Sequence, residues 1–567
     1  MRKILDGSTL TLGVCYYPEH WPQDMWAADL DRMSECGIRV VRIAEFSWNL
    51  TEPSEGVFTY DFYDRFLDLC QEKGMKVIFG TPTATPPAWL TKRYPEVLNA
   101  HADGTPLEHG GRRHYNYNAP VYREKAALIV EKLASHFGRH PAVIGWQIDN
   151  ELNCEVDEFY SAADACAFRI FLREKYGTLE ELNRAWGTVF WNQTYTDWEE
   201  ISLPKRARSG NPNPHALLDY ARFISHSACG FARMQSEILR KYLKEGDFIT
   251  TNGRFDHLDN HRMTRESLDF YTYDSYPDMA YNVDGGRLPS GLRDREASRS
   301  LSEVRSISPV FGIMEQQSGP NGWTTCMAAP APKPGQMTLW TMQSIAHGAD
   351  YISYFRWRTC TFGTEMYWHG ILDYSGRENR RMAELRSIHR KLEAIQEVAG
   401  GCYRAQVGVL KDYDNCWDLR IDMWHRDLEN VSQPAIFAAA QKTHTPEEPA
   451  EVLGVYENCY YAGEGALLRH RCRKGVVYSL GTVFTEELTA ALLEEVQAAE
   501  PERETMVLPE CCELAVREKD GKKYYFVLNY SADQVTILLK RSLVSLFDGV
   551  SVEGEVALEP YGTAVLM

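Results

Sequence analysis

Two glutamates each follow a short apolar stretch of the kind that forms a buried strand. Glu151 comes after VIGWQIDN, and Glu315 comes after PVFGIM. Polar side chains at a strand end are costly to bury without a partner, so each position suggests a pocket. Cleavage of a glycosidic bond needs two carboxyl groups: one protonates the leaving oxygen, and the other attacks the anomeric carbon or activates water. We therefore interpret Glu151 and Glu315 as candidate catalytic residues.

A single glutamate at a strand end has a simpler interpretation, as a solvated residue or as half of an ion pair. Two that converge favour catalysis, and their separation would define the mechanism. A gap of roughly 5–5.5 Å between carboxyl groups indicates a retaining reaction through a covalent intermediate, and one of roughly 6.5–9.5 Å indicates inversion. The interpretation therefore depends on a fold in which the two strand ends face each other.

Short apolar runs alternate with helical patterns over the first 395 residues. Trp26, Leu30 and Met33, for example, lie on one face of a helix that Gly37 ends. Eight such strand–helix repeats predict an α/β fold, a parallel (β/α)₈ TIM barrel. The predicted strands are 10–16, 38–46, 75–83, 143–148, 247–252, 268–276, 309–314 and 349–355.

Polar residues follow the predicted strands where such a barrel has its active site, at the carboxyl ends. They are Arg42, Glu45, Asn150, Asp274 and Tyr276, besides the two glutamates. Strands four and seven lie on opposite sides of a barrel of this size, so Glu151 and Glu315 can flank a bound sugar ring. Long loops at about 82–119 and 152–214 are expected to wall the pocket.

The pattern changes near residue 396 and again near residue 503. Residues 396–502 mix predicted helices (433–442 and 485–499) with a strand at 475–480, which indicates a small α/β domain. From 503 to 567 the runs YYFVLNY, QVTILLK, EVALEP and TAVLM predict a small antiparallel β domain, with turns at DGKK and SADQ. We therefore expect three domains: 1–395, 396–502 and 503–567.

Composition excludes several classes of partner. The formal net charge of −18 argues against nucleic acid and anionic membranes. No run of 18 apolar residues predicts a membrane span, and the first residues, MRKILDGSTLTLG, lack the sustained apolar segment of a signal peptide. The 14 cysteines form no CxxC pair and are expected to be reduced thiols. We predict a cytoplasmic location.

Several long motifs, in order, carry a resemblance to a known family. They are GVCYYPEHWP, VRIAEFSW, GTPTATPPAWL, RRHYNYNAPVYR, VIGWQIDNE, MEQQSG and YFRWR. Nearly all of the first 395 residues resemble glycoside hydrolase family 42, the β-galactosidases. The resemblance implies that Glu151 is the acid/base and Glu315 the nucleophile of a retaining double displacement. It also implies the three-domain plan of barrel, α/β domain and small β domain.

The resemblance further implies residues that bind the sugar. Arg113 and Asn150 would bind hydroxyls, with Asn150 on the 2-hydroxyl, and Tyr276 would hydrogen-bond the nucleophile. Trp323 would stack on the sugar, and Glu365 and His369 would bind its remaining hydroxyls. Each of these residues has the alternative of a structural contact at the barrel rim, which stays open above all for Glu365 and His369. For Arg42 and Glu45 we favour an ion pair that fixes other residues over direct binding to the sugar.

Three departures from the family pattern affect these expectations. Asn116 stands where many members have a zinc-binding cysteine, and Cys154 alone follows the Asn150–Glu151 pair, so we predict no structural zinc and no cofactor. Three residues separate Glu365 from His369 instead of two, which bears on sugar selectivity. The middle domain has about half of the expected length. In the family it makes trimer contacts, and a homotrimer is still expected.

The sequence therefore predicts a retaining, exo-acting β-galactosidase that hydrolyses the terminal β-galactosides of short oligosaccharides. One alternative is the same mechanism on a β-fucoside, an α-L-arabinopyranoside or a β-glucoside. These sugars differ at C4 or C5, where one hydroxyl contact can change preference strongly. The other alternative is a sugar-binding protein without turnover, against which the presence of both glutamates argues.

Overall fold

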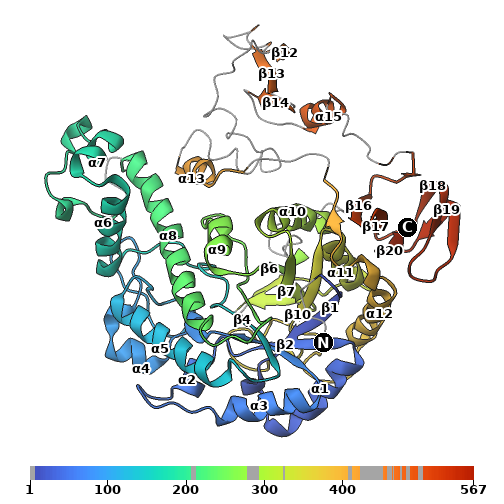
Figure 1. Cartoon of the computed structure of the whole chain (residues 1–567), viewed down its shortest axis with the longest axis horizontal. Helices are drawn as coiled ribbons and strands as arrows, with labels where there is room; N and C mark the ends of the chain where they lie inside the picture. Colours follow the sequence, from blue (N-terminus) through green and yellow to red (C-terminus); the bar gives the residue numbers. More distant parts are fainter. Residues whose placement is uncertain are drawn as a thin grey trace.

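A computed structural model gives the arrangement of the chain (Figure 1). It describes residues 7–205, 212–277, 293–323, 326–405 and 411–421, and residues 451–455, 457, 463, 465–472, 475–480, 486–495, 502 and 504–567. The predicted helix at 433–442 lies outside the described residues. All structural statements below concern the described part of the chain.

Eight parallel strands form one sheet in the order β5-β4-β3-β2-β1-β10-β7-β6. The Thr272 amide donates to the Thr251 carbonyl at 3.2 Å, which joins the two ends of this order into a ring. The predicted (β/α)₈ barrel is thereby confirmed. Its strands are β1 Thr11–Cys15, β2 Ile38–Ile43, β3 Lys76–Gly80, β4 Val143–Gln147, β5 Phe248–Thr250, β6 Tyr271–Ser275, β7 Phe311–Gln317 and β10 Ala349–Phe355.

Helices surround this ring, and their buried faces follow the apolar periodicity of the sequence. Leu30 and Met33 of α1 are fully buried, and Gly37, just beyond that helix, has a φ of 82°, which glycine adopts readily. Pro120 begins α5, at a position where its missing N–H costs nothing. The helices that follow the barrel strands in turn are α1 Trp26–Glu35, α3 Asp61–Glu72, α5 Pro120–Phe137, α8 Pro214–Leu239, α9 Asn260–Ser267, α10 Ala297–Ile307, α11 Gln336–Ala346 and α12 Arg380–Ala394.

Large side chains fill the barrel interior opposite glycines. A Cβ added at Gly13 would lie 2.3 Å from the Tyr351 hydroxyl, and one at Gly145 would lie 2.4 Å from the Phe248 ring. Replacing either glycine would therefore displace a buried aromatic ring. Tyr351 and Phe248 belong to an apolar cluster with Val40, Ile78, Phe270 and Met314.

The long loops after β3 and β4 are tied together beside the mouth. Ser161 and Asp164 form a capping box at the start of α6 (Ala162–Tyr176), and the Asn116 amide donates to Asp164 at 2.6 Å. Asn118 donates to the other oxygen of Asp164 at 2.8 Å. Asn116 thus takes part in a hydrogen-bond network with Asp164. The same loop continues through the short helix α7 (Leu179–Trp186).

Antiparallel sheets form the C-terminal part, as predicted. One sheet has the order β11-β16-β17-β20 and the other β15-β18-β19. The bounds are β11 Cys402–Tyr403, β15 Met506–Val507, β16 Cys512–Lys519, β17 Lys522–Asn529, β18 Val535–Val544, β19 Ser551–Leu558 and β20 Thr563–Leu566. Their inner faces share a small apolar core that includes Val527, Ile537 and Leu539.

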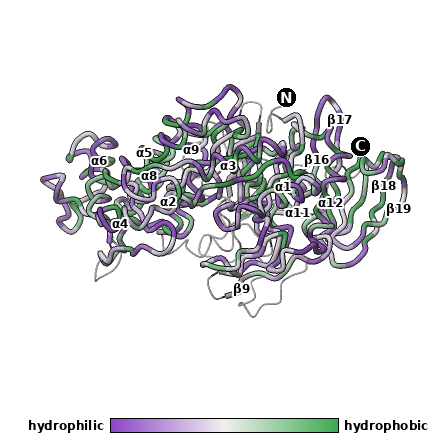
Figure 2. The backbone as a smooth tube through the Cα atoms, turned by 90° about the horizontal axis from the view of Figure 1, so that it is seen from below, coloured by the Kyte–Doolittle hydropathy of each residue, from purple (hydrophilic) through white to green (hydrophobic). Residues whose placement is uncertain are grey.

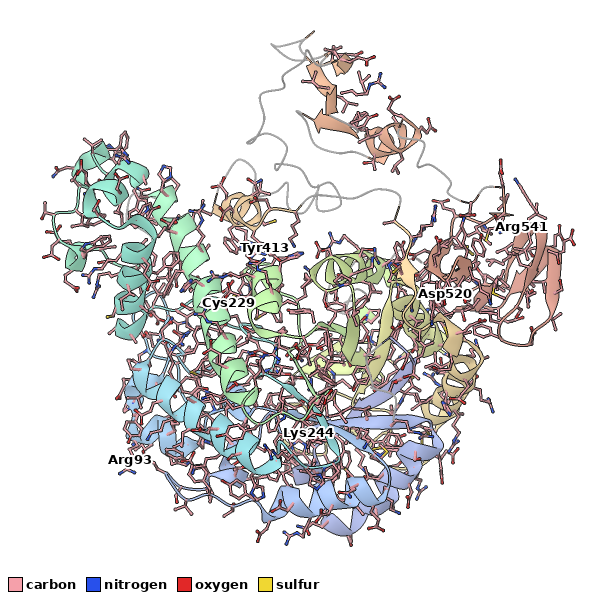
Figure 3. The ribbon with its side chains drawn as sticks, viewed as in Figure 1. Arg93, Cys229, Lys244, Tyr413, Asp520 and Arg541 are labelled. Carbon is pink, nitrogen blue, oxygen red and sulfur yellow. The ribbon has the colours of Figure 1, made fainter. Side chains whose placement is uncertain are left out.

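The middle region contains α13 (Tyr413–Ile421), the sheet β12-β13-β14 and α15 (Glu486–Glu495). Its strands are β12 Glu451–Val455, β13 Gly465–Cys472 and β14 Gly475–Leu480, the last of which has the predicted bounds. Figure 3 labels Tyr413 of α13, whose hydroxyl accepts from the Asn260 amide of α9 at 3.2 Å. Arg222 of α8 pairs with Asp414. The domain boundaries themselves stay predictions.

Hydrophilic and hydrophobic residues alternate along the backbone, as the colours of Figure 2 show. Among the described residues, no helix combines the length and the apolar character needed to cross a lipid bilayer. The apolar side chains are instead gathered into a core between the barrel strands and their helices.

Candidate active site

The two predicted glutamates meet at the carboxyl end of the barrel. Glu315 lies near the end of β7, and Glu151 lies four residues beyond Gln147, the last residue of β4. Asp274 of β6 is the register partner of Glu315. One oxygen of each of these three carboxyl groups lies within 4.8 Å of the others. Residues far apart in the sequence thus converge as the barrel predicted.

A turn with unusual backbone geometry places Glu151. Asp149, Glu151 and Asn153 have φ values of 52°, 44° and 65°, in the left-handed region that non-glycine residues rarely adopt. Such residues cost on the order of 1–3 kcal/mol each and persist where their surroundings fix them. The buried Asp149 carboxyl accepts from Thr83 at 2.5 Å and from Tyr115 at 3.1 Å. These bonds hold the turn that directs Glu151 into the mouth.

Glu315 is buried among groups that fix its orientation. The Arg42 Nη2 atom lies 2.6 Å from Glu315 and 2.6 Å from Glu45, and the Tyr276 hydroxyl donates to Glu315 at 2.5 Å. Burial raises the pKa of Glu315 to about 7, the Arg42 charge opposes this rise, and the Glu151 charge adds to it. Arg42 and Glu45 therefore form the ion pair that the sequence favoured, with Glu315 attached to it.

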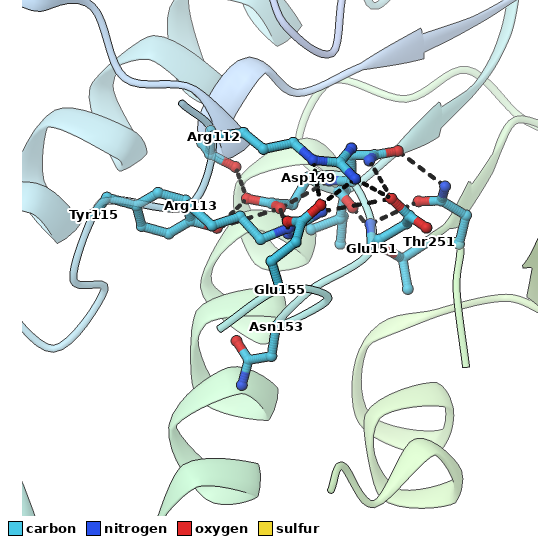
Figure 4. A network of polar contacts seen from close by, with 12 residues as sticks. Arg112, Arg113, Tyr115, Asp149, Glu151, Asn153, Glu155 and Thr251 are labelled. Carbon is cyan, nitrogen blue, oxygen red and sulfur yellow. Dashed lines mark hydrogen bonds and ion pairs between the residues drawn. The ribbon is translucent and has the colours of Figure 1, made fainter. Parts of the chain in front are cut away.

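Glu151 is the more accessible of the pair, with 13% of its side chain exposed against 6% for Glu315. The Asn150 amide donates to Glu151 at 3.1 Å. Two arginines approach the same carboxyl, Arg112 at 3.2 Å and Arg113 at 3.7 Å, and both also pair with Glu155, as Figure 4 shows. Glu151 thus lies between the pocket and a cationic network.

Asn252 links the two glutamates, and the sequence analysis missed it. Its amide NH₂ group contacts Asn150 at 2.9 Å, Asp274 at 2.9 Å and Glu315 at 3.3 Å. Its carbonyl oxygen accepts from the Glu151 backbone amide at 3.0 Å. The signal was present, because Asn252 ends a predicted strand just as Asn150 follows one, but a lone amide carries no motif.

The pocket above the glutamates has aromatic and polar walls. Trp368 stands perpendicular to Tyr276, with 5.1 Å between the ring centroids. Arg356 holds Glu365 on the rim at 3.2 Å. The lining residues are Phe46, Arg112, Asn150, Glu151, Tyr276, Glu315, Phe355, Glu365 and Trp368.

The other predicted binding residues differ in their positions. Arg113 is buried and lies behind Arg112, which lines the pocket in its place. Neighbouring arginines in RRHY cannot be told apart by sequence, and the positive φ of Arg113 (61°) separates their directions. His369 stacks edge-on against Tyr374 and does not line the pocket. The backbone of Trp323 lies in β8 (Asn321–Trp323), and its side chain is outside the described residues.

Among the described residues, Glu151, Asp274 and Glu315 are the one grouping whose spacing would suit a metal ion. The Arg42 guanidinium already supplies a positive charge to this cluster, 2.6 Å from Glu315. The arrangement therefore supports two-carboxylate chemistry by side chains alone.

Comparison with known proteins agrees with this geometry. A sequence model of a family described as beta-galactosidase matches residues 15–395, and one described as the beta-galactosidase C-terminal domain matches residues 512–567. A beta-galactosidase of Thermus thermophilus is 40% identical over 419 residues, which cover 72% of this chain and 63% of that protein. The match thus spans less than two thirds of that relative's length.

Other relatives match over their full length. Beta-galactosidase BgaA of Clostridium cellulovorans is 29% identical over 670 residues, covering 98% of this chain and 99% of that protein. A solved beta-galactosidase from Halorubrum lacusprofundi superposes with a TM-score of 0.84 at 28% identity, covering 98% of both chains. Because the family model matches most of the chain and places Glu151 and Glu315 within its range, the chain belongs to glycoside hydrolase family 42.

Proposed function

We propose that the protein is a retaining, exo-acting β-galactosidase that hydrolyses the terminal β-galactosides of short oligosaccharides. The observation that carries the proposal is the approach of the Glu151 and Glu315 carboxyl oxygens to within 4.8 Å. An approach of at most 4.8 Å between one oxygen of each group fits the separation of about 5–5.5 Å that suits a covalent glycosyl-enzyme better than the roughly 6.5–9.5 Å of inverting residues.

In this proposal Glu315 is the nucleophile. Its ionised carboxylate forms a bond with the anomeric carbon while the bond from that carbon to the leaving oxygen breaks. Arg42 and Tyr276 hold the carboxylate for this attack, since each contacts one of its oxygens. The resulting glycosyl ester is then hydrolysed by water, which releases Glu315.

Glu151 is the acid/base. It gives its proton to the leaving oxygen in the first step and takes a proton from the attacking water in the second. Its greater exposure supports this role, because leaving group and water both arrive from the pocket side. Asn150, which donates to Glu151 and lines the pocket, is placed to bind the 2-hydroxyl of the sugar.

The remaining proposed contacts to the sugar differ in how well the pocket geometry supports them. Tyr276 and Glu365 line the pocket, and Arg112 lines it where Arg113 was predicted. Arg113 then acts through Glu155 and Glu151. Trp323 is still proposed to stack on the sugar. His369 lies outside the pocket wall and is proposed to bind a sugar hydroxyl from the rim.

A second candidate function is the same mechanism on a β-fucoside, an α-L-arabinopyranoside or a β-glucoside. The observation that favours it is the separation of Glu365 and His369: the first lines the pocket, and the second packs on Tyr374. A sugar held by Glu365 alone would lose a hydroxyl contact, and selectivity at C4 or C5 depends on such contacts.

We also infer a cytoplasmic homotrimer with the three domains 1–395, 396–502 and 503–567. Three consecutive apolar residues, Val189, Phe190 and Trp191, are 84%, 65% and 80% exposed after α7. Exposed apolar groups of this kind favour contact with another subunit. Analytical ultracentrifugation with Trp191→Ser tests this inference: a smaller assembly supports it, and an unchanged mass would count against this contact.

The activity is tested with nitrophenyl β-galactoside, β-fucoside, β-glucoside and α-L-arabinopyranoside. We expect the galactoside to be fastest, and proton NMR of the first product to give the β-anomer. The variants Glu151→Gln and Glu315→Gln should lose turnover, whereas Glu553→Gln, an exposed position on β19, serves as the matched control. A first product of α configuration would exclude retention. Turnover of none of the four would favour a sugar-binding protein.

A further inference from the structure

The site contains one more carboxyl group than a double displacement uses. Asp274 lies on β6 opposite Glu315, is 9% exposed, and does not line the pocket. One of its oxygens lies within 4.8 Å of an oxygen of Glu151 and of one of Glu315. In the proposed cycle Glu151 already carries the proton that it donates, so an ionised Asp274 would place a second buried negative charge beside that of Glu315 at this spacing, and the two would repel each other strongly. A further proton, on Asp274, or a second cation would remove this repulsion.

Hydrogen bonds distinguish Asp274 from Glu315. The Glu315 oxygens accept from Arg42 and Tyr276. The Oδ2 atom of Asp274 accepts from Asn252 at 2.9 Å, and its buried Oδ1 atom has no hydrogen-bond partner among the described residues. A buried ionised carboxylate normally accepts several hydrogen bonds. The negative charge is thus supported on Glu315 and poorly supported on Asp274.

The Asn252 amide leads to the same conclusion. It has two hydrogens and three acceptors within reach, on Asn150, Asp274 and Glu315, of which Glu315 is the farthest at 3.3 Å. Asn252 therefore has one hydrogen too few for its three acceptors, and it reaches Asp274 through Oδ2 alone. This contact suits the carbonyl oxygen of a neutral acid, with the proton on Oδ1.

The charged groups around Asp274 come from four elements. Glu315 on β7 is negative, Glu151 after β4 is neutral or negative according to the step, and Arg42 on β2 is positive but already bonded to Glu45 and Glu315. The other titratable groups on β6 are the hydroxyls of Tyr271 and Tyr273, and Tyr276 follows the strand directly. Burial, followed by the Glu315 and Glu151 charges, raises the pKa of Asp274 well above its usual value.

We propose that Asp274 is a positioning residue that stays protonated through the catalytic cycle, so that Asn252 and the Arg42 pair support one ionised carboxylate, Glu315. This inference rests on the proposed function of the site. No proton leaves Asp274 in either step: the proton that moves is the one on Glu151. The neutral acid keeps a second negative charge away from Glu315 and fixes Asn252, which in turn holds the Glu151 backbone.

Asp274→Asn is the informative variant, because an amide reproduces the hydrogen-bonding pattern of the neutral acid. Its carbonyl accepts from Asn252, and its NH₂ replaces the protonated oxygen. We expect kcat/KM to fall about three- to tenfold in Asp274→Asn and about a hundredfold in Asp274→Ala, which leaves Asn252 without an acceptor. The acidic limb of the pH–rate profile should not move in Asp274→Asn.

The opposite outcome is equally specific. If Asp274 is ionised in the working enzyme, Asp274→Asn removes a negative charge beside Glu315. The acidic limb would then move to lower pH by about one unit, and the asparagine variant would be as slow as the alanine variant. Either result overturns the proposal.

Infrared spectroscopy tests the protonation state without any turnover, so its result is independent of whether the proposed function holds. The difference spectrum of the wild-type chain minus Asp274→Asn at neutral pH should contain the carbonyl stretch of a neutral carboxylic acid. The matched difference for the exposed Glu553→Gln should contain carboxylate bands instead. Carboxylate bands for Asp274 would refute the proposal. Equal thermal midpoints of Asp274→Asn and Asp274→Ala would show that the difference in their activity does not come from misfolding.

Discussion

Two buried carboxyl groups in this molecule behave in opposite ways. Glu315 at the barrel mouth has its pKa raised to about 7, whereas Glu513, where the C-terminal sheet meets the barrel, has its pKa lowered to about 2. Burial is the largest cause in both and raises both. At Glu513 it is outweighed by His347 at 2.8 Å, Ser298 at 2.7 Å and Tyr530 at 2.8 Å.

The difference lies in how the partners are shared. His347, Ser298 and Tyr530 all bond to the one carboxylate of Glu513. Arg517 also has all three guanidinium nitrogens bonded, to Asp350, Ile345 and Gly401. At the mouth, one arginine serves Glu45 and Glu315 together, while Glu151 and Asp274 stand opposite. At the interface each buried charge has its own partners, which stabilises the fold. At the reactive site several carboxyl groups compete for one arginine, which costs stability.

The largest expected effect is that of Glu315→Gln, which separates activity from stability. We expect turnover to fall by roughly 10⁴-fold or more, as for other catalytic side chains. A raised pKa contributes stability that is complete below about pH 4.5 and is lost as the pH rises through about 7. The variant lacks this loss, so its thermal midpoint should exceed that of the wild-type chain at pH 8 and approach it at pH 4.5. If Glu315→Gln were less stable than the wild-type chain at pH 8, the contrast drawn between Glu315 and Glu513 would be wrong.

Arg517→Met is expected to have the largest effect on stability at the interface. The substitution leaves the buried Asp350 without its partner at 2.9 Å, and breaking one side of a buried pair typically costs about 3–5 kcal/mol. Urea unfolding at pH 7 measures this cost. Arg541→Met, on the partly exposed side of the C-terminal sheet, is the matched control. A similar loss in both variants would show that the Arg517 bonds have no special weight.

Glu513→Gln should destabilise the chain somewhat less, and with the opposite pH dependence to Glu315→Gln. A lowered pKa contributes stability that is present above about pH 4.5 and is lost as the pH falls toward 2. The shift corresponds to roughly 3 kcal/mol at neutral pH, which should vanish in strong acid. Thermal midpoints at several pH values measure it, while glycosidase turnover of the folded variant reports any indirect effect. A loss of stability that does not depend on pH would contradict the assignment.

The sequence predicted the barrel because its signals are local and repeated. The strands are short apolar runs, several of which have polar residues at or just beyond their ends, and α5 at 120–137 has the predicted bounds. Glu151, Glu315, Asn150 and Tyr276 were proposed as site residues because they follow such runs or belong to long motifs, and all four line one pocket. Their convergence at the mouth follows from the closure of the barrel.

The parts that could not be predicted depend on side-chain direction. Arg112 and Arg113 are neighbours in sequence, and the structure places Arg112 in the pocket lining, whereas Arg113 has a positive φ and is not part of that lining. Asn252 and Asp274 acquire their importance from contacts across β4, β5, β6 and β7, which no spacing in the sequence encodes. One residue more than in the family pattern separates His369 from Glu365. In the structure His369 lies outside the pocket wall.

The smallest expected effect concerns Glu155, which sharpens the comparison at the partly exposed edge of the site. Burial raises the pKa of Glu155, but the charges of Arg112 and Arg113 lower it by more, so the pKa falls below its usual value. Glu155 therefore stays ionised and pairs with both arginines. In Glu155→Gln the two arginines would turn their charge toward Glu151, which favours its ionised form and slows proton donation to the leaving oxygen. Because Glu155 is about a third exposed, we expect only a three- to tenfold fall in kcat. Substrates with a better leaving group need less proton donation and should lose less, whereas the exposed Asp157→Asn should change neither. An equal loss on both classes of leaving group would assign Glu155 to substrate binding instead.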